Sequence, residues 1–408
     1  MTVDRSADEL APVQSTATAA PALEHRPGRW IANWDAEDKG QWEAEGRSIA
    51  KRNLYWSIFA EFLGFVVWQL WSIVVVQLPA AGFQFDTNQI FWLISIPSLV
   101  GATLRIPYTF MVPKFGGRNW TIVSALLLLI PTTGLAICVS NPETPFGIML
   151  LMAALAGFGG GNFASSMANI TFFYPAREKG WALGLNAAGG NLGAAVAQLV
   201  VPIAITLLAA GTVNLPMAGI IWIPLIIIAA FGAYKYMNNL TSAKGDVAGS
   251  LARPYGGRMA DRMGGARMTI ASFASMAVIT LTMIWTLPLK NFWLFLTLFL
   301  LLFLASGFGN GATYRMIPVI FATSSRAARA GAPSATTARL ASSSLGLISA
   351  IGAYGGFVIP QVLNASNTAS GSYTPAFYGF VGAYVLMLTV CWVCYIRPAR
   401  KRNTIGHI

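Results

Sequence analysis

The chain has 408 residues, of which 55% are hydrophobic and only 10% are charged. A soluble domain carries roughly 25% charged residues, so this composition excludes an ordinary soluble enzyme or binding module. The net charge of +12 would suggest nucleic acid in a soluble protein. Here the bases lie in short segments between long apolar blocks, where membrane orientation explains them better. We therefore predict an all-α integral membrane protein with the lipid bilayer, and no nucleic acid, as its partner.

The first 53 residues are predicted to form a cytoplasmic tail. Residues 1–28 are rich in Ala, Thr and Pro, which is typical of disorder. The stretch RWIANWDAEDKGQWEAEGRSIAKRN that follows mixes tryptophan with charge, which favours an amphipathic segment at the membrane surface. We expect no signal peptide, because the first apolar block starts near Leu54.

Ten apolar blocks are long enough to cross a bilayer as complete helices. They predict an N-terminal bundle of six helices over 54–237 and an incomplete C-terminal bundle over 269–397. A cytoplasmic loop with a truncated helix stub (238–268) lies between the bundles, and a cytoplasmic tail (398–408) follows them. The blocks are 54–80, 89–112, 119–139, 145–173, 180–209, 215–237, 269–289, 292–322, 334–363 and 376–397.

The charges of the loops predict the orientation. One set of loops is basic, and the opposite set carries Asp86, Glu143 and, as its one base, Lys290. By the positive-inside rule the basic side is cytoplasmic, so both termini are expected in the cytoplasm of a multi-pass protein of the cell (inner) membrane. The basic set consists of Lys114, Arg118, Arg177, Lys179, Arg258, Arg262, Arg267, Arg326, Arg329 and the tail RPARKR.

Three features of the first half recur in order in the second half. GATLRIPYTFMVPKFGGRNWT around Arg105 is similar to GSLARPYGGRMADRMGGARMT around Arg253; GFGGGNFASSM from Gly157 is similar to GFGNGATYRM from Gly307; and NAAGGNLGAAVAQLVVP from Asn186 is similar to SAIGAYGGFVIPQ from Ser349. Two six-helix pseudo-repeats are the layout of major facilitator transporters. We therefore predict that fold, with about ten complete transmembrane helices.

The repeat also predicts a deficit. A whole helix and most of another precede Arg105, whereas almost nothing apolar lies between Lys235 and Arg253. About 35–40 residues that the symmetry requires are absent, corresponding to a seventh helix and the front of an eighth.

Arg105 lies about two-thirds of the way along its span, and Arg253 is its symmetry mate. A charge inside a membrane span is costly unless it is paired or functional. The guanidinium donates paired hydrogen bonds that match flat oxygens, so two facing arginines predict a site for one small oxyanion. Arg105 could instead snorkel to the surface, and Arg253 could lie outside membrane depth.

Two other charged residues are candidates for coupling or gating. Glu61, near the cytoplasmic start of the first span, could carry a proton or gate an arginine. Arg315, like Arg339, lies near the cytoplasmic end of its span, where snorkelling or an interdomain salt bridge is the more ordinary role.

The glycine runs admit two interpretations. Small residues let helices pack closely in lipid, and they also let backbone and Asn191 approach a small ligand at Gly189, Gly190 and Gly355. The runs do not favour a nucleotide-binding site, because they lie within helices and not in a turn from a strand to a helix. We predict no enzyme, metal or cofactor: His25 and His407 lie in the tails, and Cys391 and Cys394 are read as packing residues.

The motifs RIPYTFMVPKFGGRNWT, GGGNFASSMANITFFYP, EKGWALGLNAAGGNLG, SLARPYGGRMADRMGGAR and GAYGGFVIPQ resemble the nitrate/nitrite porter family of the major facilitator superfamily. The resemblance implies twelve helices around a central nitrate site. In it the paired arginines match Arg105 and Arg253, Phe65 matches an aromatic that stacks on the anion, and Asn191 matches a polar contact. Tyr354 stands where the second motif would repeat Asn191.

The leading hypothesis is a monomeric nitrate/nitrite transporter that works by alternating access. The scarcity of carboxylates in the spans favours anion exchange, whereas Glu61 keeps proton-coupled uptake open. The alternatives are a truncated, non-transporting family member, because the family's seventh helix is missing here, and a transporter of another small anion.

Overall fold

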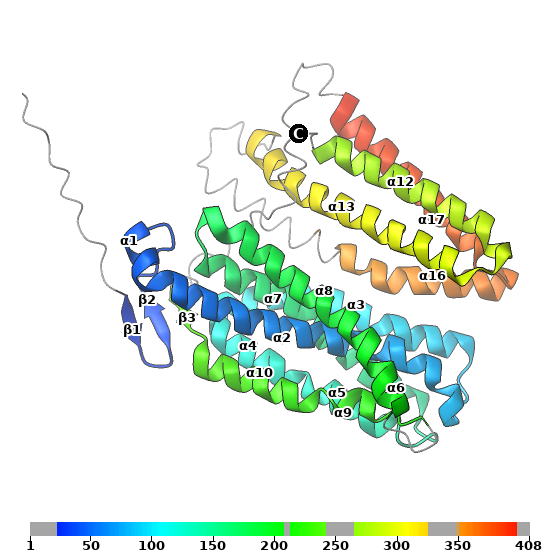
Figure 1. The fold of residues 1–408 in the computed structure, drawn as a ribbon, viewed down its shortest axis with the longest axis horizontal. Coiled ribbons are helices and arrows are strands. Elements are labelled where there is room, and N and C mark those ends of the chain that lie inside the picture. Colours follow the sequence, from blue (N-terminus) through cyan, green and yellow to red (C-terminus); the bar gives the residue numbers. More distant parts are fainter. Residues whose placement is uncertain (1–22, 208–212, 242–264, 325–347, 349–350, 398–408) are drawn as a thin grey trace, which may run out of the picture.

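The computed structural model describes residues 23–207, 213–241, 265–324, 348 and 351–397, with only the backbone at 176, 180, 308 and 310–324. Helices form two groups that lie side by side (Figure 1). The N-terminal group consists of α2 (Arg47–Val74), α3 (Thr87–Phe115), α4 (Gly117–Leu127), α5 (Leu129–Cys138), α6 (Phe146–Leu155), α7 (Gly157–Phe173), α8 (Ala176–Leu207), α9 (Met217–Ile220) and α10 (Ile223–Tyr236). The C-terminal group consists of α12 (Gly265–Thr286), α13 (Phe292–Ser324), α16 (Gly355–Ser370) and α17 (Thr374–Cys391).

Eight described helices are long and apolar enough to cross a membrane, and they match the six predicted N-terminal spans and the predicted spans 269–289 and 376–397. The predicted span 292–322 is a helix throughout, α13. Most of the predicted span 334–363 lies outside the described residues. Its described part, α16, continues to Ser370, seven residues beyond the predicted end. The prediction stopped where the apolar block gives way to Asn and Ser residues, but these residues continue the helix.

The first helix begins earlier than predicted. One continuous helical segment runs over Lys39–Gln77, through a short α1 (Lys39–Gln41) and a wide turn at Trp42–Gly46. Lys51 and Arg52, two bases of the predicted tail, lie within α2: the Arg52 guanidinium donates to the Asn238 side chain, and the Lys51 ammonium lies 5.7 Å from the Tyr55 ring centre. Glu61 therefore lies in the middle of α2, farther from the start of the helix than the predicted span suggested.

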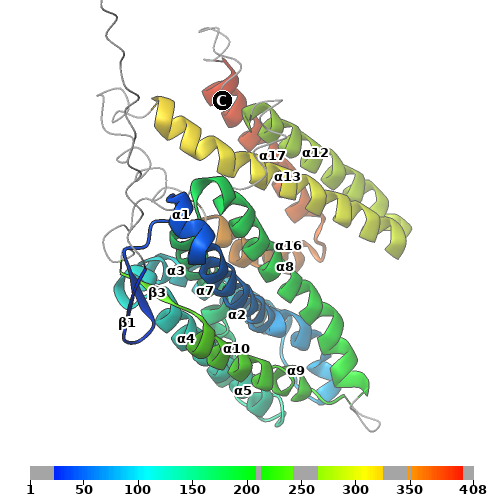
Figure 2. The ribbon, with the colours of Figure 1, turned by 60° about the vertical axis from the view of Figure 1, so that its left-hand side comes forward.

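A small sheet closes the end of the N-terminal bundle where the chain enters it (Figure 2). Strand β1 (Glu24–Arg26) pairs antiparallel with β2 (Trp30–Ala32), and β2 pairs parallel with β3 (Asn239–Leu240). The β1–β2 turn places Gly28 and Arg29 at positive φ. Arg29 then donates from Nε to the Met237 carbonyl over 2.8 Å. The sheet thus ties the segment before α1 to the segment after α10, and the prediction that disorder extends to residue 28 is wrong.

The tryptophans of the predicted surface segment face the protein. Trp34 and Trp42 are 8% and 2% exposed. The Trp34 indole donates to the Phe172 carbonyl and its ring meets Phe173, while Trp42 meets Tyr174. The expected amphipathic segment is instead a short strand, a turn and the start of the helical segment, and its two tryptophans pack on protein because the end of α7 offers these rings a surface.

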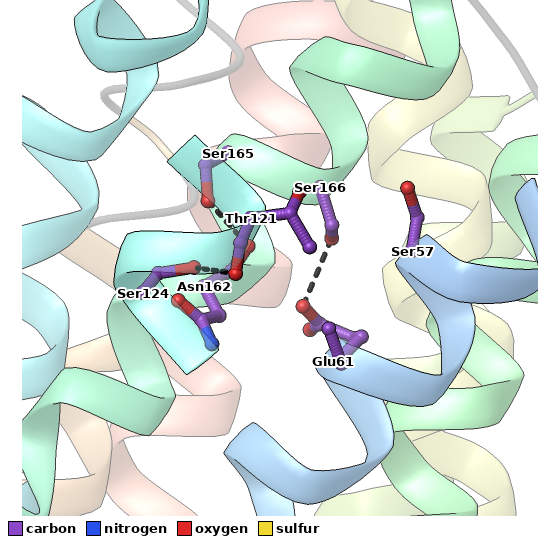
Figure 3. A pocket seen from close by; sticks show the side chains of 8 residues that line it. Ser57, Glu61, Thr121, Ser124, Asn162, Ser165 and Ser166 are labelled. Atoms are coloured by element: carbon purple, nitrogen blue, oxygen red, sulfur yellow. Dashed lines mark hydrogen bonds between the residues drawn. The ribbon is translucent and has the colours of Figure 1, made fainter. Parts of the chain in front are cut away.

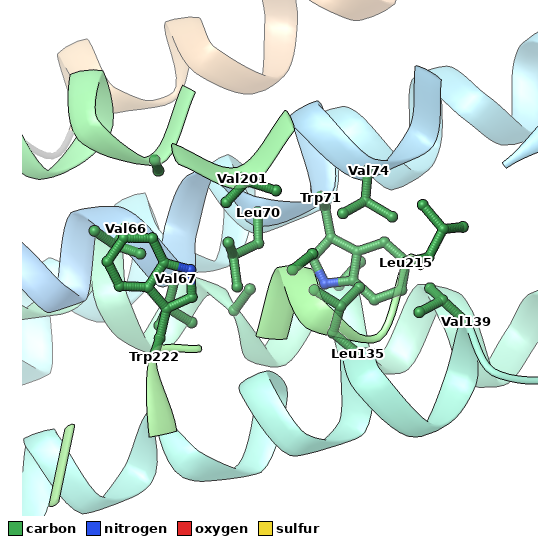
Figure 4. Packing of buried hydrophobic residues seen from close by; sticks show 14 of the residues in the cluster. Val66, Val67, Leu70, Trp71, Val74, Leu135, Val139, Val201, Leu215 and Trp222 are labelled. Atoms are coloured by element: carbon green, nitrogen blue, oxygen red, sulfur yellow. The ribbon is translucent and has the colours of Figure 1, made fainter. Parts of the chain in front are cut away.

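The apolar core of the N-terminal bundle surrounds α2. Figure 4 shows side chains of α2, among them Trp71 and Leu70, against Leu135 of α5 and the α9–α10 segment with Trp222. Residues from several helices thus hold α2 on all sides, which fixes the depth and rotation of Glu61 and Phe65.

Helices α3 and α16 join the two groups. Three polar pairs line their contact: Thr103 Oγ1 with the Tyr354 hydroxyl (3.0 Å), Gln361 Nε2 to Ser95 Oγ (2.7 Å), and Asn364 Nδ2 to Asn88 Oδ1 (2.9 Å).

Candidate functional site

Arg105 lies about two-thirds of the way along α3, as predicted from its place in the apolar block. Its half-buried guanidinium donates from Nε to the Gly160 carbonyl of α7 over 3.2 Å. The guanidinium carbon lies 4.9 Å from the Phe163 ring centre and 5.8 Å from that of Trp68. The side chain therefore turns toward α2 and α7 rather than along α3 to the membrane surface, which argues against snorkelling.

Three aromatic rings form the wall beside Arg105. Phe65, which the sequence predicted as a site residue, is buried; its ring centre lies 5.4 Å from that of Trp68 and 6.2 Å from that of Phe163. Sequence reasoning missed Trp68 and Phe163. Their signal was available, because Trp68 follows Phe65 by one helical turn and Phe163 lies within the GFGGGNFASSM motif.

Glycines allow the helices around these rings to approach closely. A Cβ built at Gly160 would lie 3.0 Å from Trp68 and from the Gly101 Cα, and one at Gly190 would lie 3.1 Å from the Phe65 ring. At the neighbouring Gly189 the obstacle would be Ile58, at 2.5 Å. Gly189 and Gly190 thus set the distance of α8 from α2, and only Gly190 contacts the aromatic wall.

The remaining predicted site residues are not gathered here. Asn191 is exposed on α8, and Gly355 is half-buried at the start of α16, where a Cβ would meet open space. Arg253 and Arg339 lie outside the described residues. Arg315 lies in α13, but its side chain is not described. The first half of the predicted arginine pair is therefore placed, and the second half is not.

Glu61 is part of a separate buried polar network. It is fully buried, and the Ser166 hydroxyl donates to Glu61 Oε2 over 2.9 Å. Ser166 in turn accepts from Asn186 Nδ2 over 2.8 Å. Figure 3 shows Glu61 and Ser166 beside a small cavity with space for about one water molecule. Its lining residues are Ser57, Ala60, Glu61, Thr121, Ser124, Asn162, Ser165 and Ser166.

Residues 58–245 match the family model of the Major Facilitator Superfamily. The nitrate/nitrite transporter NarU of Escherichia coli (strain K12) is 37% identical over 444 aligned positions, which cover 90% of this chain and 96% of that protein. The probable nitrate/nitrite antiporter NarK2 of Thermus thermophilus is 31% identical, with 93% of this chain and 99% of that protein covered. This chain belongs to the nitrate/nitrite porter family of the major facilitator superfamily.

Family membership makes the chain a multi-pass membrane protein with the all-α major facilitator fold. The comparison with NarU can also be set against the prediction that about 35–40 residues of the repeat are absent from this chain. The alignment with NarU has 444 positions, and the 90% of this chain that it covers is about 367 of the 408 residues. About 77 of those positions are therefore gaps in this chain, where the porter from Escherichia coli has residues that this chain lacks. Within the part of the chain that the structure describes, no group of three His, Cys, Asp or Glu side chains could hold a metal ion.

Proposed function

We propose that this porter carries nitrate and nitrite across the cell (inner) membrane by alternating access. The observation that supports it most is the setting of Arg105: a cation within a membrane helix, held by the Gly160 carbonyl and enclosed by the rings of Phe163 and Trp68. Such a charge is costly in lipid unless it has a function. Its relatives, a nitrate/nitrite transporter and a probable nitrate/nitrite antiporter, indicate the substrate class.

In this proposal the anion lies between Arg105 and Arg253. The planar guanidinium of Arg105 donates paired hydrogen bonds to a flat oxyanion, and the buried Phe65 ring, next to Gly190, supplies an apolar face for its plane. Asn191, Gly189 and Gly355 stay in the proposal as contacts predicted from the sequence, although none of them touches the aromatic wall in this structure. Arg315 is assigned a gating role on the cytoplasmic side. Neutralising both arginines lets the two bundles rock about the site, which requires the α3–α16 contact to open.

The remaining features of the proposal follow from the loop charges and the composition. Both termini are cytoplasmic by the positive-inside rule. The protein acts as a monomer, needs no cofactor and catalyses no covalent step.

The test is uptake of labelled nitrate by proteoliposomes that contain the purified chain. We expect Arg105→Ala to abolish saturable uptake, because the anion loses its charged partner. Arg26→Ala is the matched control, since Arg26 is exposed and pairs with Glu24 on the protein surface. Undiminished uptake by Arg105→Ala would contradict the site. Competition by chlorate, formate or sulfate stronger than by unlabelled nitrate would identify a porter of another anion.

A second candidate is a family member that does not transport. It is favoured by the positions of NarU that have no counterpart in this chain and by the absence of the repeat's seventh-helix sequence before Arg253. Uptake by the 408-residue chain above that of empty liposomes would exclude this candidate.

A further inference from the structure

Three arginines from different parts of the sequence meet around the end of α10 and the segment that follows it. Arg118 of α4 donates from Nε and Nη2 to one carbonyl in the last turn of α10, over 3.0 and 2.8 Å. Arg29 of the β1–β2 turn donates from Nε to the Met237 carbonyl over 2.8 Å. Arg52 of α2 donates from Nη2 to the Asn238 side chain over 3.0 Å. Arg29, Arg52 and Arg118 form what we call the arginine cluster, at the end of the N-terminal bundle that carries the small sheet (Figure 2).

Among the described residues, no acid forms an ion pair with the arginine cluster. The ion pairs of this part of the chain join other bases to Glu24, Glu45 and Glu178. The partners of the cluster are neutral carbonyl and amide oxygens. The end of α10 adds only about half a negative charge through the helix dipole. Three guanidinium charges therefore gather with most of their charge unbalanced.

Two members of the cluster have donors to spare for a ligand. Arg118 is 8% exposed, and it donates four hydrogen bonds to protein oxygens, so it mainly holds the fold. Arg29 and Arg52 are half-buried, and the hydrogen bonds described for them number two and one. A guanidinium has five N–H groups. Nε of Arg52 is buried without a hydrogen-bond partner, which is costly, so the protein alone does not satisfy this side chain.

Tyrosine and lysine side chains surround this end of the bundle. Tyr55 and Tyr234 are 54% and 60% exposed. The Lys51 ammonium lies 5.7 Å from the Tyr55 ring centre, and the Lys235 ammonium lies 5.5 Å from that of Tyr236. Tyrosine is typical of the interface between membrane and water, and lysine near a helix end extends toward it. In the proposed orientation this end is cytoplasmic, and the cytoplasmic leaflet carries anionic lipids.

We propose that the arginine cluster binds the phosphate group of an anionic phospholipid of the cytoplasmic leaflet. Arg29 and Arg52 donate charge-assisted hydrogen bonds to the phosphate oxygens, which the planar guanidinium suits well, and Arg118 adds its charge. Because Arg29 belongs to the small sheet and Arg52 to α2, one bound lipid holds the N-terminal segment against the bundle. The site rests on the proposed orientation of the chain and is independent of the transported anion.

The test is mass spectrometry of the intact full chain in detergent, with phosphatidylglycerol or with phosphatidylcholine of the same acyl chains. Choline neutralises the phosphate, so the wild type should bind phosphatidylglycerol more tightly. Arg29→Gln and Arg52→Gln should each weaken this binding roughly fivefold, the contribution of one basic side chain near a membrane surface. Arg47→Gln is the control on the same helix as Arg52, because its exposed guanidinium pairs with Glu178. It should bind as the wild type.

Arg52→Lys separates charge from a purely structural role. It keeps the charge, so it should bind phosphatidylglycerol more tightly than Arg52→Gln does, whereas a structural arginine would lose as much in either variant. Thermal unfolding gives a second readout, since phosphatidylglycerol should raise the melting temperature of the wild type more than that of Arg29→Gln.

Inorganic phosphate at matched ionic strength distinguishes the lipid from the free anion. It should not displace phosphatidylglycerol, because it lacks the acyl chains that hold the headgroup at the interface. Displacement by inorganic phosphate would overturn the assignment to a lipid. Equal binding of the two lipids to the wild type, or undiminished binding in both glutamine variants, would overturn the site itself.

Discussion

At the scale of single residues, Arg105 stands out for the geometry of its contacts as much as for its charge. Its Nε donates to the Gly160 carbonyl, and aromatic rings flank the guanidinium plane. A guanidinium can hold a protein carbonyl and an anion at once because its donors point in several fixed directions. A lysine ammonium carries the same charge without that plane.

We therefore expect Arg105→Lys to fold and still to transport poorly. Loss of paired, charge-assisted hydrogen bonds should lower the rate of nitrate uptake at low substrate concentration by roughly 10-fold to 100-fold. Initial rates over a range of nitrate concentrations in proteoliposomes measure this change. Arg26→Lys is the matched control on the surface. Wild-type rates in Arg105→Lys would mean that charge alone suffices at this position.

At the scale of helices, the crossing of α2 and α7 depends on glycine. A Cβ at Gly64 would lie 3.0 Å from the Gly159 carbonyl oxygen, and a Cβ at Gly159 would overlap the Gly64 backbone. Because backbone lies on both sides, no flexible side chain can move aside. The same crossing places Phe65 beside Phe163 and Glu61 beside Ser166.

Gly159→Ala should therefore separate α2 from α7. We expect a loss of about 1–3 kcal/mol of stability, the usual cost of overpacking, together with weaker nitrate uptake because Phe65 and Phe163 move apart. Thermal unfolding in detergent measures the first effect. Gly147→Ala is the control, since this exposed glycine of α6 has open space where its Cβ would lie. Equal melting temperatures for the two variants would contradict the close crossing.

The sequence predicted most of the helices, because a bilayer requires about 20 apolar residues per crossing and the blocks are that long. The position of Arg105 along α3 was predicted correctly because the ends of the apolar block lie close to the ends of the helix. The sequence misplaced the start of α2, since Lys51 and Arg52 resemble tail residues until Tyr55 and Asn238 are seen beside them. Trp68, Phe163 and Asn162 were missed because apolar blocks do not reveal which helix faces meet. Glu61 drew notice as an acid, but its partners became visible only in the fold.

At the scale of the whole molecule, the two groups of helices differ in how much protein surrounds them. In the most apolar window of the first span 61% of residues are buried, against 6% in that of Thr374–Ile396. Large side chains of the C-terminal helices, among them Trp285 and Trp293, are 82% and 74% exposed. Not every span follows this contrast, because the window of Ala266–Leu289 is 28% buried, as are those of Thr87–Phe115 and Arg177–Leu207.

Inserting the helices that the repeat predicts to be missing tests that prediction. A variant in which a seventh helix and the front of an eighth, designed from NarU, are inserted before Arg253 should show faster nitrate uptake than the 408-residue chain, because the proposed site would gain the helix that the repeat predicts. Uptake by proteoliposomes with equal amounts of each protein measures the gain. An inserted segment of equal length and shuffled sequence is the control. Equal uptake by all three proteins would mean that the shorter chain already has a complete site.

The small sheet of β1, β2 and β3 has a consequence for how the protein is made. Its last strand ends at Leu240, so every residue that closes the N-terminal bundle has been synthesised before the ribosome reaches α12. The first half can thus complete its tertiary structure in the membrane while the second half is still untranslated. The packing that positions Arg105, Phe65 and Glu61 therefore does not have to wait for the second half.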